Sequence, residues 1–592
     1  MAPLISLQSV SKQFGTKSLF SNLSYTISPG DRIGIIGPNG SGKSSLLKIL
    51  QGEEDVDDGT ISKSKDLTVC YVSQNFLLDA GQSAEDLIES SANPFQVRAG
   101  LDLLGLQITS EKLSQLSGGQ RKKLQLALSF AEETDLLLLD EPSNHLDLNS
   151  IIELEKILDR RHQAIVMISH DRWLLETFSE RIIEINPTLS DGYFYSDDSY
   201  LEFLAQKTLY LEAEQKNFES LKNKVRQEQA WLRQGAKARS TKSKHRTASA
   251  ENLISLLGET KSRRQANSLT MEFVGSGRGT KDLVEFENVS KSFGDRPILD
   301  NLSFKLQRGS RFGLMGSNGS GKSTILRLIT GDLKEDRGVI KKANNLKITY
   351  FSQFSDAVDP DLPLKSVLNP DGDAVVFQGR SIHIASWAKR FGFDPKSLHQ
   401  PYGSLSGGER AKVRISTLML EQPDVLLLDE PTNDLDISTL EVLEESLLEF
   451  TGAIILVTHD RYMLNKVCST FIGIQEGGHF VHCSSYEQWM NANEMLVDTK
   501  SSSTPQADSK SKNAADKKSG KLTFNEQQEY NKMSRTIEEA EKKVQDLEVK
   551  ILQFEGDELL RKCEELGHAQ KKVELLYKRW EDLEERVKSL KN

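Results

Sequence analysis

The sequence predicts an α/β protein in which two P-loop nucleotide-binding domains lie in tandem, joined by an α-helical hairpin linker and followed by a C-terminal antiparallel coiled coil. Short apolar strands precede two glycine-rich octets, GPNGSGKS at residues 37–44 and GSNGSGKS at residues 316–323. The motifs that follow each octet recur at matched spacings, as expected for two copies of one fold. The end of the chain alternates apolar spacings of three and four residues, which is typical of a coiled coil.

Length and composition indicate several packed domains. At 592 residues, with a formal net charge of -11, the chain can form about three to five domains of ordinary size. No apolar run approaches the ~20 residues that cross a bilayer, and the N-terminus lacks the pattern of a signal peptide, so we expect no membrane span and a cytoplasmic location. The cysteines have neither metal-ligand spacing nor the density of a disulfide scaffold, which predicts reduced structural thiols at Cys70, Cys468, Cys483 and Cys563.

The first octet has the context that phosphate binding requires. An apolar strand is expected at residues 32–36 and a helix at residues 45–50, with the glycines between them. Glycine lets backbone N–H groups curl around a phosphate at a helix N-terminus, while Lys43 adds a cation and the Ser44 hydroxyl can ligate Mg²⁺. The predicted nucleotide-binding residues of this loop are Gly37, Pro38, Asn39, Gly40, Ser41, Gly42, Lys43 and Ser44.

Further motifs follow the octet in order. They are Gln74 in YVSQ, LSGGQ at residues 116–120, LLLLDE ending at Asp140 and Glu141, SNHLD ending at Asp147, and ISHD containing His170. LSGGQ alone would be weak evidence, but the ordered set resembles the nucleotide-binding domain of the ABC ATPase superfamily. The resemblance implies ATP and Mg²⁺ as ligands and hydrolysis of ATP to ADP and phosphate as the reaction.

The second half repeats the series. Phe293, Lys322 and Gln353 follow Phe14, Lys43 and Gln74 by 279 residues each. From the LSGGE motif onward the displacement is 289 residues, as between His170 and His459, so ten residues are inserted between the glutamine and this motif. The second loop is predicted to bind nucleotide through Gly316, Ser317, Asn318, Gly319, Ser320, Gly321, Lys322 and Ser323.

The ABC resemblance implies a role for each motif residue. Mg²⁺ would be held by Ser44, Gln74 and Asp140 in the first copy and by Ser323, Gln353 and Asp429 in the second. Glu141 and Glu430 would be the general bases, His170 and His459 would contact the γ-phosphate, and Gln74 and Gln353 would sense it beside the metal. Because no motif carboxylate, lysine or histidine is missing from either copy, we expect both sites to hydrolyse ATP.

In this superfamily each signature motif caps the nucleotide of the opposite domain. The resemblance therefore implies that Ser406, Gly407 and Gly408 complete the first site, and that Ser117, Gly118 and Gly119 complete the second. The sites would form when the two halves of one monomer close. Phe14 and Phe293 match the aromatics that stack on adenine, although a lone phenylalanine near a strand end is equally often a core residue.

Residues 200–281 are predicted to form the linker. Leu211, Phe218, Leu221 and Val225 have helical spacing, and a second apolar group follows at residues 253–257, so we expect two antiparallel helices with a flexible return at residues 275–280. Residues 222–246, near their turn, hold nine Lys or Arg against one acid, which favours a polyanionic partner. The candidate nucleic-acid contacts are Lys222, Lys224, Arg226, Trp231, Arg233, Lys237, Arg239, Lys242, Lys244 and Arg246. The alternative is a solvated linker in which Trp231 packs against the partner helix.

The remaining boundaries follow composition. We predict ATPase domains at residues 1–199 and 282–494, a flexible tether at residues 495–520, rich in small and polar residues, and the coiled coil at residues 521–592. The coiled coil holds 15 Lys or Arg against 17 Asp or Glu, so it has no bulk positive field for DNA. An intramolecular or protein-docking role and a DNA-binding role both stay open for it.

Twin ATPase domains in one chain, a linker of about 80 residues, and EPSNHLD and EPTNDLD after the two strands resemble the ABC-F family. Within that family, the linker sequence WLRQGAKAR and the tail sequence KLTFNEQQEY look most like the Uup subgroup. This resemblance implies a translation factor that binds the ribosomal E site and directs its linker toward the P-site tRNA. Alternatives are a DNA-binding ATPase of genome maintenance, acting in transposon excision or on branched DNA through the coiled coil, and the engine of a transporter with separate membrane subunits.

Overall fold

The structure is a computed structural model. It describes residues 2–15, 17–74, 83–106, 112–233, 253–255, 257–258, 269, 271–294, 296–351, 358–370, 372–475, 478–486 and 488–489. All of them belong to one compact unit, Met1–Ser502. The predicted tether at residues 495–520 and the predicted coiled coil at residues 521–592 lie outside the described residues.

The first ATPase domain is built on a six-stranded sheet with the order β5-β6-β7-β3-β8-β9. Its strands are β3 (Arg32–Ile36), β5 (Val69–Val72), β6 (Leu136–Asp140), β7 (Ala164–Ile168), β8 (Arg181–Ile185) and β9 (Tyr193–Ser196). All neighbouring strands are parallel except β8 and β9, which are antiparallel. β6 and β7 are apolar along nearly their whole length because both faces of this sheet are buried. Parallel order brings the carboxyl ends of β3, β6 and β7 to one edge, where ligands bind in open α/β sheets.

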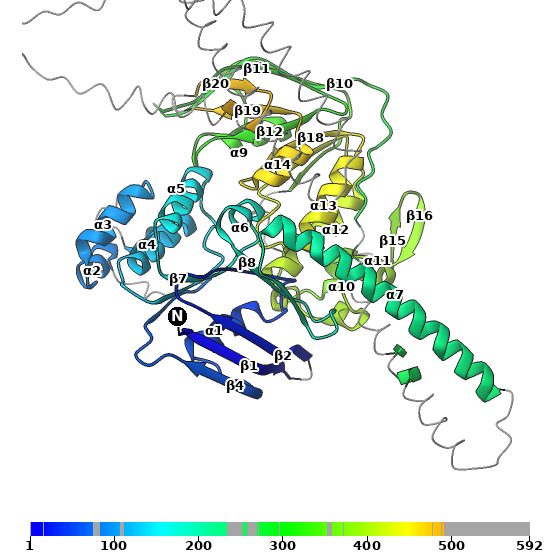
Figure 1. The fold of residues 1–592 in the computed structure, drawn as a ribbon. Coiled ribbons are helices and arrows are strands. Elements are labelled where there is room, and N and C mark those ends of the chain that lie inside the picture. Colours follow the sequence, from blue (N-terminus) through cyan, green and yellow to red (C-terminus); the bar gives the residue numbers. More distant parts are fainter. Residues whose placement is uncertain are drawn as a thin grey trace, which may run out of the picture. The chain divides into compact units, whose positions relative to one another are not determined.

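A smaller antiparallel sheet and a set of helices complete this domain. The sheet has the order β2-β1-β4, and Figure 1 shows these strands side by side in blue. Its strands are β1 (Ile5–Phe14), β2 (Lys17–Ile27) and β4 (Asp58–Lys63). The helices are α1 (Lys43–Gln51), α2 (Ala84–Glu89), α3 (Pro94–Leu103), η1 (Leu113–Gln115), α4 (Gly118–Phe130), α5 (Leu148–Asp159) and α6 (Arg172–Phe178).

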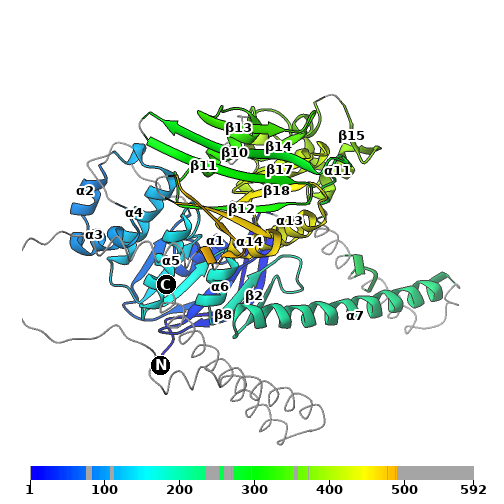
Figure 2. The same ribbon diagram turned by 90° about the horizontal axis from the view of Figure 1, so that it is seen from above.

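The second ATPase domain repeats this plan, which confirms the predicted tandem fold. Its main sheet has the order β14-β17-β18-β12-β19-β20, and its antiparallel sheet has the order β11-β10-β13, whose strands run together in Figure 2. The strands are β10 (Asp282–Phe293), β11 (Arg296–Gln307), β12 (Arg311–Met315), β13 (Arg337–Lys342), β14 (Ile348–Phe351), β17 (Val425–Asp429), β18 (Ala453–Val457), β19 (Thr470–Ile474) and β20 (Phe480–Cys483). The helices are α9 (Lys322–Thr330), α10 (Leu364–Leu368), α11 (Ile384–Arg390), η2 (Pro395–His399), η3 (Tyr402–Ser404), α12 (Gly407–Leu420), α13 (Ile437–Glu449) and α14 (Arg461–Val467).

A β-hairpin distinguishes the helical region of the second domain. Strands β15 (Ala374–Phe377) and β16 (Arg380–His383) pair antiparallel between the predicted glutamine and signature motifs, where the sequence has its ten extra residues. The turn places Gln378 at φ 52° and Gly379 at φ 72°. Two left-handed residues match the twist that a two-residue hairpin needs, which explains the glycine in this turn.

The linker begins as one long helix. Helix α7 (Tyr200–Arg233) is continuous in Figure 1 and holds Leu211, Phe218, Leu221 and Val225. Val225 is buried, Phe218 and Leu221 are half-buried, and Leu211 is exposed. Residues 253–255 and 257–258 are also helical, while the predicted turn between the helices lies outside the described residues. Within the part of the chain that the structure describes, no helix is long and apolar enough to cross a membrane.

The interpretation of residues 275–280 as a flexible return is wrong. Upstream, the amide of Phe273 donates to Ser446 Oγ at 3.0 Å, and the Phe273 side chain is only 3% exposed. Within the segment, Ser276 Oγ donates to Asp424, and Arg278 Nη1 donates to the Asn345 carbonyl at 3.1 Å. The apolar anchor and the buried Asp424 carboxylate therefore dock this segment on the second domain, although its glycine content suggested mobility.

Candidate active site

The first octet joins β3 to the first turn of α1 and forms the loop in which a phosphate is predicted to bind. Gly37 and Gly42 have φ values of 142° and 103°, which L side chains rarely adopt. A Cβ on Gly37 would also lie 2.0 Å from the carbonyl oxygen of Ile185, so only glycine fits. Lys43 Nζ donates to the carbonyls of Gly37 and Pro38, at 2.8 and 3.1 Å. Burial lowers the pKa of Lys43, and the nearby Glu141 carboxylate opposes that shift.

The two predicted general bases occupy strained backbone positions directly after β6 and β17. Glu141 and Glu430 have φ values of 48° and 51°, and such left-handed geometry costs roughly 1–3 kcal/mol for a non-glycine residue. The Glu141 amide donates to the Ile168 carbonyl at 3.0 Å, and the Glu430 amide donates to the Val457 carbonyl at 2.8 Å. These bonds hold each carboxylate beside the strand that ends next to the predicted histidine.

Each carboxylate lies beside a histidine, and Glu141 is buried. His170 Nε2 lies 3.3 Å from Glu141 Oε1, yet neither carboxylate oxygen of Glu141 has a hydrogen-bond partner. Burial raises the pKa of Glu141 to about 8 against the attraction of Lys43, and burial lowers the pKa of His170 to about 3. In the second domain His459 Nε2 lies 3.1 Å from Glu430 Oε1, and only Oε2 of Glu430 lacks a hydrogen-bond partner. An unpartnered buried carboxylate next to a phosphate cradle is a suitable acceptor for the proton of a water molecule.

The predicted metal ligands lie close together in the second domain. Ser323 Oγ donates to Asp429 Oδ2 at 3.1 Å, and Tyr350 Oη donates to the same oxygen at 3.0 Å. Among the residues that the structure describes, no group of three or more His, Cys, Asp or Glu side chains is placed to hold a metal ion. One serine and one aspartate nevertheless fit Mg²⁺, which keeps several waters and is usually shared with substrate phosphates. Gln353 lies outside the described residues.

Both domains line one cleft of about 480 Å³. The first domain contributes, among others, Phe14, Asn39, Gly40, Gly42, Lys43, Ser44, Gln74, Asp140, Glu141, Asn144 and His170. The second contributes Ser406, Gly407, Gly408 and Asp434. The structure therefore brings together the residues predicted for a shared first site, in a volume within the usual range for ligand pockets.

Hydrogen bonds across the domain interface hold this cleft. The Asn39 amide donates to Asp436 Oδ2 at 3.0 Å, and Asn39 Nδ2 donates to the Asp434 carbonyl at 2.6 Å. A Cβ on Gly408 would lie 2.2 Å from Asn39 Nδ2, so a side chain at this position would displace the Asn39 side chain that bonds the second domain. Ser406 caps helix α12, whose N-terminus carries the partial positive charge that favours an anion.

The second site has a matching P-loop lysine and a matching signature helix, but its hydrogen bonds across the domain interface differ. Lys322 Nζ donates to the Gly316 and Ser317 carbonyls at 2.8 and 3.1 Å, and Ser117 caps helix α4 before Gly118 and Gly119. Across the described residues, no hydrogen bond joins Asn318 to the first domain, in contrast to Asn39. His145 stands where the second domain has Asp434, so the two sites differ in sequence at this contact.

The two predicted adenine-stacking residues are exposed. Phe14 is 77% exposed at the border of the cleft, and Phe293 is 51% exposed with Lys291 Nζ 5.8 Å from its ring centroid. The alternative that they are core residues is therefore wrong. Stacking on adenine stays a prediction, and their exposure leaves both rings free to make that contact.

Some residues beside the cleft were missed in the sequence. Lys122 Nζ donates to the Ser73 and Asp140 carbonyls, at 3.2 Å each, and burial lowers its pKa to about 8. It therefore ties the segment before Gln74 to the end of β6. The second copy has Ala411 at the matching position, so the repeat offered no signal for Lys122. Asp434 and Asp436 belong to the recognised EPTNDLD motif, but a motif does not reveal that they contact Asn39.

The predicted nucleic-acid residues are only partly described. Lys222, Lys224 and Arg226 are exposed on α7, and Lys222 Nζ lies 3.5 Å from Glu219 Oε2. Trp231 and Arg233 belong to the last turn of α7. Lys237, Arg239, Lys242, Lys244 and Arg246 lie outside the described residues. Lys222, Lys224 and Arg226 thus extend the basic segment onto exposed positions of a helix.

Two family models match the chain. The ABC transporter model matches residues 20–144 and 299–433, and the ABC transporter C-terminal domain model matches residues 521–585. ATP-binding protein Uup of Caulobacter vibrioides is 34% identical over 484 residues, covering 81% of this chain and 78% of the relative. Energy-dependent translational throttle protein EttA of Haemophilus influenzae is 30% identical over 523 residues, covering 80% of this chain and 93% of the relative.

The fold also occurs in a solved structure of the archaeal ribosome recycling factor aABCE1, in complex with the ribosomal stalk protein aP1. The match covers 83% of this chain and 92% of that chain, with a TM-score of 0.57 and 17% identity, so it supports the tandem fold alone. The relatives that cover four fifths of the sequence carry the family assignment. With its two P-loops and its shared cleft, this chain is an ATP-binding, ATP-hydrolysing protein that belongs to the ABC-F family.

Proposed function

We propose that the chain is a cytoplasmic translation factor that binds the ribosome while two ATP molecules hold its ATPase domains together. The observation that carries the proposal is the cleft in which Lys43 and Glu141 of one domain face Ser406 of the other. Because residues of both domains complete this site, hydrolysis of the bound ATP would allow the two domains to separate. The printed name of the relative EttA, an energy-dependent translational throttle protein, supports translation as the process.

The described side chains divide the work of hydrolysis. Lys43, now bonded to two loop carbonyls, is in reach of the β- and γ-phosphates of a nucleotide in the cradle. Glu141 accepts the proton of the attacking water, and neutral His170 donates a hydrogen bond to the γ-phosphate. The N-terminus of α12 stabilises the phosphate charge from the opposite side. The mirror site assigns these tasks to Lys322, Glu430, His459 and the N-terminus of α4.

Mg²⁺ would be held by Ser44, Gln74 and Asp140, and in the mirror site by Ser323, Gln353 and Asp429. When bound, it neutralises charge on the phosphates. The hydroxyl of Tyr71 donates to Asp140 Oδ2 at 3.2 Å and orients that carboxylate before the ion arrives. Tyr350 does the same for Asp429. The tyrosines therefore fix which carboxylate oxygen stays available.

The linker is the proposed contact with tRNA. Residues 222–246 carry nine cations, of which Lys222, Lys224 and Arg226 are exposed on α7. If about six of them meet phosphates, affinity should fall by roughly three orders of magnitude between low and moderate salt. Trp231 is the proposed stacking residue, because unpaired RNA bases stack on aromatic side chains.

Cosedimentation with ribosomes tests this proposal. The Glu141→Gln, Glu430→Gln variant should bind ATP without hydrolysing it and pellet with ribosomes in ATP but not in ADP. Changing the nine cations of residues 222–246 to Gln should weaken the pellet at least tenfold, whereas Trp231→Ala alone should weaken it less. Equal pelleting in ATP and ADP would contradict the proposal.

Duplex DNA and a truncation after Gly520 test the second candidate function. A separate family model matches residues 521–585, so this tail is a domain distinct from the two ATPase domains. Binding to DNA alone, lost with the tail and unaffected by the linker changes, would replace the ribosome by DNA as the partner. It would also move the functional contact from residues 222–246 to residues 521–592.

A further inference from the structure

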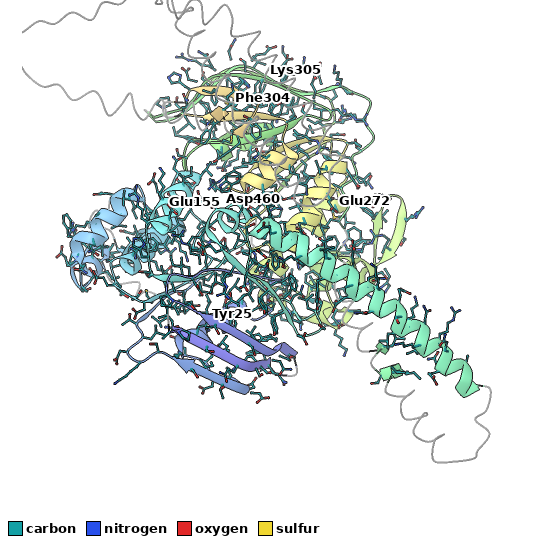
Figure 3. The ribbon with its side chains drawn as sticks, in the orientation of Figure 1. Tyr25, Glu155, Glu272, Phe304, Lys305 and Asp460 are labelled. Atoms are coloured by element: carbon teal, nitrogen blue, oxygen red, sulfur yellow. The ribbon has the colours of Figure 1, made fainter. Side chains whose placement is uncertain are left out.

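An arginine two residues after each predicted γ-phosphate histidine crosses the interface between the ATPase domains. Arg172 is the third residue of HDR in the first domain, and its Nη2 donates to Glu444 and to Asp460 Oδ2, the latter at 3.1 Å. Arg461 is the matching residue of the second domain, and its Nη2 donates to Glu155 Oε1 at 2.5 Å. Figure 3 labels Glu155 and Asp460, one partner from each domain.

The contacts are reciprocal. Arg461 follows Arg172 by 289 residues, and Glu444 follows Glu155 by the same 289 residues. Each arginine also covers an aromatic ring of the opposite domain: Arg172 lies 4.9 Å from the Tyr462 centroid, and Arg461 lies 5.2 Å from the Trp173 centroid. Because the repeated sequence forms matching contacts, the same kind of interdomain ion pair occurs twice, related by the symmetry of the two domains.

Burial makes these ion pairs sensitive to domain separation. The Arg172 and Arg461 side chains are 5% and 6% exposed, and the Glu444 side chain is fully buried. A buried ion pair loses far more than a surface pair when one partner is withdrawn, because the remaining charge is left without compensation. Since the partners belong to different domains, each pair is complete only in the closed arrangement of the domains.

The first arginine also adjoins the base of the linker. Tyr200 and Phe203, in the first turn of α7, are fully buried in a cluster that includes Leu175 of α6 and Ile437 of α13. The hydroxyl of Tyr200 lies within the electrostatic field of Arg172 and Glu441. The start of the linker therefore rests on both domains at the place where Arg172 joins them.

The second arginine has the equivalent position at the end of the second domain. Trp489 follows Tyr200 by 289 residues and is buried in a cluster that contains Tyr486 and, from the first domain, Leu148. Tyr486 lies in the field of Arg461 and Glu155. Tyr200 and Tyr486 thus each lie in the field of an arginine that is held by the opposite domain.

We propose that Arg172 is a positioning residue that couples closure of the ATPase domains to the orientation of α7, and that Arg461 has the matching role beside Tyr486 at the end of the second domain. Closure completes the ion pair, and the completed pair seats Tyr200 against α13. Opening withdraws Glu444 and Asp460 from Arg172 and releases the base of α7. This inference rests on the proposed closure by ATP. It predicts that the orientation of the linker depends on whether ATP occupies the sites.

The test measures the distance between spin labels on α7 and α13 in the full chain. The labels are placed at Ser220→Cys and Glu445→Cys, both exposed positions, in a Glu141→Gln, Glu430→Gln, Cys563→Ser background. Arg172→Gln is the test variant, and Arg172→Lys is the conservative variant. Arg181→Gln is the matched control, because Arg181 pairs with Asp31 and Asp197 inside the first domain. Melting temperature without nucleotide is recorded for each variant.

In the parent, ATP should produce one narrow distance, and ADP should leave a broad distribution. Arg172→Gln should require roughly tenfold more ATP to produce the narrow distance, because the buried Glu444 loses its partner from the opposite domain and keeps only Lys466 of its own domain. Arg172→Lys should recover part of the response, and Arg181→Gln should respond like the parent. A structural role alone would lower the melting temperature of Arg172→Gln without changing its ATP response, and that result would overturn the inference. A parent that shows no ATP response would contradict the proposed closure itself.

Discussion

Asn39 gives the sharpest test of how the two ATP sites differ. Its Nδ2 donates to the Asp434 carbonyl of the opposite domain, while its backbone amide bonds Asp436. Asn39→Ala removes the first bond and keeps the second, because only the side chain changes. A neutral hydrogen bond contributes about 0.5–1.5 kcal/mol, so the variant should need about two- to tenfold more ATP for half-maximal hydrolysis.

Asn318→Ala is the matched control. It removes the equivalent side chain from the second loop, where the described residues offer no hydrogen bond across the interface. Steady-state ATPase assays over a range of ATP concentrations should show a raised KM for Asn39→Ala and a change below about twofold for Asn318→Ala. Equal effects of the two substitutions would refute the reasoning, because they would show that both loops are locked alike.

Three further predictions follow from burial and charge. Phe14→Ala should raise the KM for ATP while leaving the melting temperature unchanged, because the ring is 77% exposed; a large loss of thermal stability would contradict its assignment to the ligand side of the cleft. Phe273→Ala should lower the free energy of unfolding by about 3–5 kcal/mol, measured by denaturant titration, because its buried ring anchors the linker return. Burial raises the pKa of Glu141 and Glu430 from 4.5 to about 8, so ionising them disfavours the folded state and stability falls as pH rises between those values. The double Gln variant without nucleotide should therefore match the parent near pH 4.5 and melt at a higher temperature above pH 8; identical melting curves at both pH values would argue against the raised pKa.

The sequence predicted those parts of the fold and site that a local pattern can specify. P-loop glycines, the carboxylates after apolar strands and the signature serines are set by phosphate and metal chemistry, so their residue types and spacing were informative. The tandem repeat was visible because each copy must form the same site. Closure across the interface was implied by the family resemblance, and the cleft with Ser406 agrees with it.

Contacts between distant segments were beyond such patterns. Arg172 and Glu444 are 272 residues apart, and nothing in either local sequence indicates that each neutralises the other. The glycines of residues 275–280 suggested mobility. The sequence does not show that Ser276 bonds the buried carboxylate of Asp424, which holds the segment. The role of Lys122 could not be predicted, because buried lysines are unusual and the matching position of the second copy is Ala411.

The central claim is that each ATP is held by both domains, and retention of labelled ATP after gel filtration tests it most directly. The Glu141→Gln, Glu430→Gln variant should retain two ATP per chain, and adding Lys322→Ala should leave one, in the first site. In that background Gly408→Asp should release the remaining ATP, whereas Gly119→Asp should keep it. Retention of the last ATP with Gly408→Asp, or its loss with Gly119→Asp alone, would contradict a first site completed by the signature of the second domain.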